Sequence, residues 1–64
     1  MNIQSAIFRG ANILKDKNIF SSQLDAEILM AKAIGKDKKY IILNNQKNLE
    51  TEELNNFQTL IFER

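Results

Sequence analysis

The residues best suited to chemistry are two carboxylates, Asp25 and Glu27, at the start of the apolar run LDAEILMAKAIGK. Two carboxylates can share a proton or chelate one ion only when both face the same point. A helix advances by about 100° per residue, so these two side chains diverge by about 200°. Their spacing therefore excludes a catalytic or chelating pair.

Each carboxylate has a structural role that its position predicts. Asp25 lies in the first turn of a helix, where the macrodipole stabilises a negative charge. Glu27 lies on the same side as Ala31 and Ile34, so we expect it to be partly buried. A partly buried charge needs a partner, and we expect an ion pair with Arg9. A contact between Glu27 and a ligand or a partner protein is the alternative.

The composition removes most other kinds of site. The 64 residues include no cysteine and no histidine, which excludes thiol catalysis, thiolate zinc sites and the usual general base. Nine basic and eight acidic residues leave a formal charge of +1, which argues against strong electrostatic binding of nucleic acid. The sequence has no glycine-rich phosphate loop and no nucleophile beside a base. We therefore expect no catalytic, cofactor-binding or metal-binding residue in these 64 residues.

The length corresponds to one small domain, residues 1–64. No apolar run approaches the roughly 18–20 residues that span a bilayer, and MNIQSAIFRG lacks the pattern of a signal peptide. We expect a cytoplasmic domain with no membrane partner.

Apolar periodicity predicts an all-α fold of four helices, over residues 2–17, 22–34, 38–43 and 51–64. Asn18 and Gly35 suit the left-handed ends of the first two helices, and Asp37 suits the N-cap of the third. A strand over residues 40–43 is the alternative for the third element, but the chain offers it no partner strand.

Three apolar features predict how the bundle packs. The helix over residues 22–34 is apolar around most of its axis, which indicates the central, buried helix. Gly10 on the apolar face of the first helix predicts close approach of another helix. If that helix breaks near Gly10, the bundle has five helices. Phe62 points away from the apolar stripe of the last helix, which indicates a surface that another part or protein covers.

Three lysines, Lys36, Lys38 and Lys39, cluster beside Tyr40. The simplest interpretation is a solvated helix start. An acidic partner surface or a phosphate contact is the alternative. A small helical nucleic-acid-binding module would use the same lysines together with the aromatic ring.

The order of these motifs resembles a known family. The stretch NIFSSQLDAEILMAKAIGKDKKYIIL is similar to the N-terminal helical domain of the HemK-type peptide chain release factor glutamine methyltransferases. That family has Gly-Ile, then Ser-Pro-Arg-Leu-Asp-Ala-Glu-Leu-Leu-Leu, then Leu-Gly before a basic turn into an aromatic-led helix. The closing LETEELNNFQTLIFER resembles the family's last domain helix, Leu-Ser-x-Glu-Glu-Leu-x-x-Phe ending in Arg.

The resemblance implies a function for a longer parent enzyme. Such enzymes transfer methyl from S-adenosylmethionine to the glutamine amide of the Gly-Gly-Gln motif in class I release factors. The cofactor domain and its Asn-Pro-Pro-Tyr motif lie C-terminal to the region matched, so the resemblance implies an excised domain. The implied partners are a release factor and the parent's own catalytic domain; nucleic acid is not expected. A purely structural cap on the catalytic domain is the alternative role.

The chain also departs from the family pattern. Ser22 replaces Pro and Asn18 replaces Gly, changes that preserve a helix start and a left-handed cap. Lys32 stands where His is common. Gln23 replaces Arg, so a partner contact of that Arg does not carry over. The residues expected to contact a partner are Glu27, Lys36, Lys38, Lys39 and Phe62.

Overall fold

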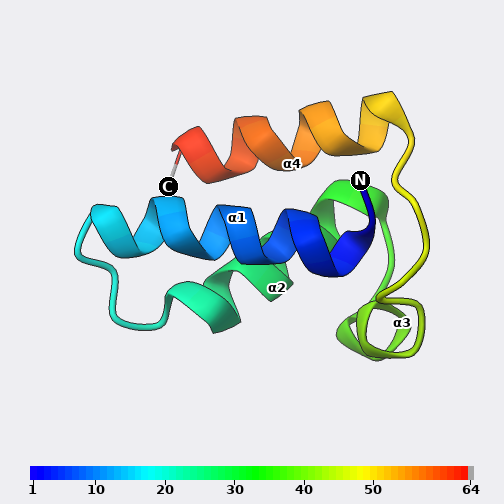
Figure 1. Ribbon diagram of the computed structural model, residues 1–64, viewed down its shortest axis with the longest axis horizontal. Helices are drawn as coiled ribbons and strands as arrows, with labels where there is room; N and C mark the ends of the chain where they lie inside the picture. The colour runs from blue at the N-terminus through cyan, green and yellow to red at the C-terminus, as the bar shows by residue number, and fades with distance from the viewer. Residues whose placement is uncertain (64) are drawn as a thin grey trace.

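A computed structural model describes residues 1–63 of the chain. These residues form four helices, α1 (Ile3–Asp16), α2 (Ser22–Ile34), α3 (Lys38–Leu43) and α4 (Thr51–Glu63). Helices α1 and α4 run side by side in the same direction, and α2 runs the opposite way (Figure 1). Helix α2 packs against each of the other three, which confirms its central position and the all-α fold of four helices. Helix α1 continues unbroken through Gly10, so a fifth helix does not form.

Local conformations and hydrogen bonds set the helix ends where the sequence predicts. Asn18 has a φ of 63° and Gly35 a φ of 70°, the left-handed conformation that closes a helix. Asp37 Oδ1 accepts a hydrogen bond of 2.8 Å from the backbone N–H of Tyr40 and so caps α3. At the start of α4, Glu53 Oε1 accepts from the Glu50 N–H at 3.0 Å, half of a capping box.

The N-terminus of α1 is closed by the loop between α3 and α4. The N–H groups of Ile3 and Gln4 donate to the carbonyls of Lys47 and Asn45, at 3.0 and 2.8 Å. Asn2 forms an isolated antiparallel bridge with Asn48, and its side chain accepts from the Ser5 N–H at 2.8 Å. The loop therefore satisfies backbone donors that the first turn of a helix leaves unpaired.

The core lies between α2 and the pair formed by α1 and α4 (Figure 1). Its buried side chains come from all four helices: Ile3, Ala6, Ile7, Ala11, Leu14, Ala26, Met30, Ile41, Phe57 and Ile61. The expected burial around α2 is wrong on one side. Leu24 and Ile28 remain 45% and 51% exposed, because the other three helices cover only the opposite face of α2.

Gly10 is where α4 comes closest to α1, as the sequence predicts. A Cβ atom at this position would lie 2.6 Å from Cζ and 2.9 Å from Cε2 of Phe57, and 3.0 Å from Cδ1 of Ile61. Phe57 and Ile61 are 2% and 1% exposed. Only a residue without a side chain allows this packing.

We predict that Gly10→Ala destabilises the domain despite the better helix propensity of alanine. Propensity alone would add about 1 kcal/mol to the free energy of unfolding. Overpacking against a buried ring costs about 1–3 kcal/mol, so the expected net loss is up to about 2 kcal/mol in urea unfolding.

The control is Asn12→Ala on the exposed face of the same helix, which should be neutral or slightly stabilising. Against a Phe57→Leu background, Gly10→Ala should cost less because the ring edge is gone. A stabilised Gly10→Ala variant would contradict the close contact.

Candidate functional site

The structure brings together Glu27 and Lys38, two of the residues expected to contact a partner. Glu27 Oε1 lies 3.6 Å from Lys38 Nζ, and Gln23 Nε2 donates to Glu27 Oε2 at 3.3 Å. The expectation of an ion pair is confirmed, but Arg9 as its partner is wrong. Glu27 faces the start of α3, while Arg9 lies on the side of α1 that borders α4. The side chains of Lys38 and Glu27 are 50% and 24% exposed, so the pair is accessible from solvent.

A second group of lysines surrounds Tyr40. Lys36 Nζ and Lys47 Nζ lie 5.4 and 5.7 Å from the ring centroid, within the range of cation–π contacts. Lys47 Nζ also donates to Tyr40 Oη at 2.9 Å. This hydrogen bond, followed by the electrostatic interaction with Tyr40, raises the pKa of Lys47 above its usual value. Lys39 is exposed on the same short helix.

The Tyr40 arrangement bears on nucleic-acid binding. Base stacking needs an open aromatic face. The ring is only partly exposed and already contacts two ammonium groups, which does not favour stacking. Lys47 was not predicted to join this group, because it lies seven residues after Tyr40, beyond the turn that follows α3.

Phe62 lies far from these lysines in the sequence and contacts a different one. Its side chain is 68% exposed, as the sequence predicts. Lys17 Nζ lies 5.9 Å from its ring centroid and donates to the carbonyls of Ile61 and Phe62 at 3.5 and 3.4 Å. Lys17 thus supplies a positive charge at the C-terminal end of α4, where the macrodipole favours one.

The outer face of α2 is apolar and uncovered. Phe20, just before the helix, is fully exposed, and Leu24 and Ile28 follow it at intervals of four residues. Leu24 and Ile28 therefore lie one turn apart on the same face of α2, and Phe20 lies in the turn just ahead of it; we call the three residues the α2 stripe. The sequence contains this interval of four residues. Because α2 is apolar around most of its axis, the sequence did not indicate which apolar face stays exposed.

Within residues 1–63, no cluster of three His, Cys, Asp or Glu side chains could hold a metal ion. Helices long and apolar enough to cross a bilayer are also absent from this range. Asp25 is half-buried in the first turn of α2 and Glu27 pairs with Lys38, in line with separate structural roles for the two carboxylates. The described side chains therefore suit binding of another molecule at the protein surface.

Comparison with known proteins identifies relatives. The family described as the PrmC N-terminal domain matches residues 5–64. A protein of Clostridium botulinum named release factor glutamine methyltransferase is 31% identical over 61 residues. That alignment covers 95% of this chain but only 22% of the relative's length. No solved structure matches the chain.

We predict that the ion pair contributes little to stability, because both side chains contact solvent. A double-mutant cycle of Glu27→Gln and Lys38→Met should give a coupling free energy below about 1 kcal/mol in urea unfolding. The matched cycle of Glu27→Gln and Arg9→Met should give no coupling. A larger coupling in the second cycle than in the first would contradict the assignment of Lys38 as partner.

Proposed function

The chain belongs to the PrmC N-terminal domain family, and from this membership we propose that it is the recognition domain of a release factor glutamine methyltransferase. In this proposal the parent enzyme transfers methyl from S-adenosylmethionine to the glutamine amide of the Gly-Gly-Gln motif of a class I release factor. The domain that binds the cofactor and performs the transfer is a separate part of the parent. Residues 1–64 help to bind and position the release factor.

The observation that supports a recognition role is the uncovered α2 stripe. Leu24 and Ile28, one turn apart on α2, are about half exposed, and Phe20, just ahead of the helix, is fully exposed. Burying such a face against a partner removes apolar area from water, which stabilises a complex by about 25 cal/mol per Å² before the costs of association. A face of this kind on a small domain is typical of an interaction surface.

Polar groups border the stripe and supply a rim. Glu27 and Lys38 form their ion pair beside Leu24 and Ile28, and Lys36 follows the end of α2. Interfaces between separate proteins commonly combine an apolar centre with a polar border that sets orientation. Together these residues form the surface that we assign to the release factor.

A purely structural cap on the catalytic domain is the second candidate, and Phe62 favours it. An exposed aromatic ring at the end of α4 would be covered if a following domain packed against it. The two roles differ in what they affect. A cap determines the thermal stability of the parent enzyme, whereas a recognition domain determines the KM for the release factor.

We predict that unlabelled release factor shifts the amide resonances of the α2 stripe when titrated into the ¹⁵N-labelled domain. Replacing Leu24 and Ile28 together by serine should weaken this interaction by about tenfold. Each substitution removes from the contact the exposed half of one apolar side chain. Phe62→Ser is the control, since Phe62 lies outside the stripe, and should leave the affinity unchanged.

Absence of any shift at high release factor concentration would count against a recognition role for the domain. In the parent enzyme, the Leu24 and Ile28 variant should then also leave the KM for the release factor unchanged. A cap would be indicated if Phe62→Ser lowered the melting temperature of the parent without affecting that KM.

A further inference from the structure

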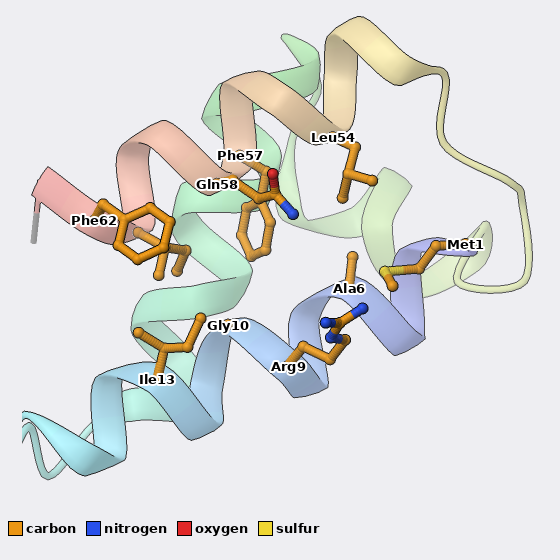
Figure 2. Close-up of a pocket in the computed structure, with 10 residues that line it drawn as sticks. Met1, Ala6, Arg9, Gly10, Ile13, Leu54, Phe57, Gln58 and Phe62 are labelled. Atoms are coloured by element: carbon orange, nitrogen blue, oxygen red, sulfur yellow. The ribbon is translucent and has the colours of Figure 1, made fainter.

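A cleft of about 170 Å³ lies between α1 and α4, on the side of these helices away from α2 (Figure 2). Its floor is apolar and includes Gly10 and the ring of Phe57, which is 2% exposed. Ile13 on α1 and Phe62 on α4 form apolar walls. The close approach of the two helices at Gly10 keeps this floor continuous.

Arg9 is the one charged side chain among the residues that line the cleft. It extends from α1 into the mouth of the cleft, and Gln58 faces the same space from α4 (Figure 2). The carboxylate of Glu27, which the sequence predicted as the partner of Arg9, is bound to Lys38 instead, so it does not occupy the Arg9 guanidinium. At one end of the cleft, Lys17 Nζ lies against the Phe62 ring and adds a second positive charge.

The size of the cleft limits what can occupy it. Sites for cofactors and drug-sized molecules measure about 300–1,000 Å³, well above this cleft. An apolar cavity of about 150 Å³ accommodates a single benzene ring. The cleft therefore suits one large apolar side chain, and the arginine at its mouth suits a carboxylate beside that side chain.

We propose that the α1–α4 cleft binds a segment of a partner protein in which a large apolar residue, Phe or Leu, is followed by Asp or Glu. The apolar side chain enters between Ile13 and Phe62 over the Phe57 ring. The adjacent carboxylate pairs with Arg9, and Gln58 hydrogen-bonds the peptide backbone. This site is separate from the α2 stripe, and the inference does not depend on the proposed function.

The test uses blocked hexapeptides titrated into the ¹⁵N-labelled domain. The probe is acetyl-Gly-Ser-Phe-Glu-Ser-Gly-amide, and two matched peptides replace its Glu by Lys or its Phe by Ala. The probe should shift the amide resonances of Gly10, Ile13 and Gln58 at millimolar concentration. Changing Glu to Lys should weaken binding about two- to fivefold, as expected for an exposed ion pair, and changing Phe to Ala should abolish it.

Variants of the domain assign the contacts. Arg9→Gln should remove the preference for Glu over Lys in the peptide, while Lys15→Gln, on the same helix but outside the cleft, should keep it. Both positions are exposed, so both variants should fold. Phe62→Ser should weaken binding of the probe peptide but leave release factor binding at the α2 stripe unchanged. The two measurements therefore separate failure of this inference from failure of the proposed function.

Three results would overturn the proposal. No shift of the cleft residues with the Phe-Glu peptide would exclude the site. Hexanoate acting as strongly as the peptide would indicate a small carboxylate as the occupant. Cleft shifts that depend on domain concentration, with no peptide present, would indicate a second copy of the chain.

Discussion

The contact between Gly10 and the ring of Phe57 determines how close α4 can lie to α1. Because Gly10 has no side chain, the Phe57 ring occupies the space that a Cβ would need. A Cβ at Gly10 would lie 2.6 Å from Cζ of Phe57. Phe57 and Ile61 can then reach the core that α2 shares with α1. The same contact forms the floor of the cleft on the far side of the two helices (Figure 2). Packing inside the domain and the shape of one of its surfaces thus depend on a single missing methyl group.

The helix boundaries could be predicted because they depend on residues a few positions apart. A left-handed Asn18 or Gly35 ends a helix through its own backbone, and Asp37 caps α3 through the N–H of Tyr40, three residues along. The core face of α1 was predicted for a similar reason, since its apolar residues recur with one clear period. Local geometry is sufficient for features of this kind.

The rest depends on contacts between segments distant in the sequence. Glu27 pairs with Lys38 instead of Arg9 because α3 packs beside α2, and helical periodicity does not determine that arrangement. The carbonyls of Asn45 and Lys47 close the start of α1 across more than forty residues, a contact that no local sequence pattern predicts. Arg9 at the mouth of the cleft was assigned to the wrong neighbour for the same reason.

The composition of α2 is more apolar than the core of this domain requires. Ala26 and Met30 are fully buried, and Leu29, Ala31, Ala33 and Ile34 pack partly against the core. Leu24 and Ile28 lie outside the core cluster and are about half exposed, and Phe20, just ahead of the helix, is fully exposed. Single exposed apolar residues are ordinary on protein surfaces, but here two lie one turn apart on the same helix face and a third lies just ahead of that helix.

A domain of this size gains limited stability from its own core, so apolar side chains left in water are not explained by folding. The stripe is explained if α2 serves two contacts at once. Its inner face packs against the three other helices, and its outer face is available to a partner protein. The central helix would then be both the element that holds the domain together and the element that presents its binding surface.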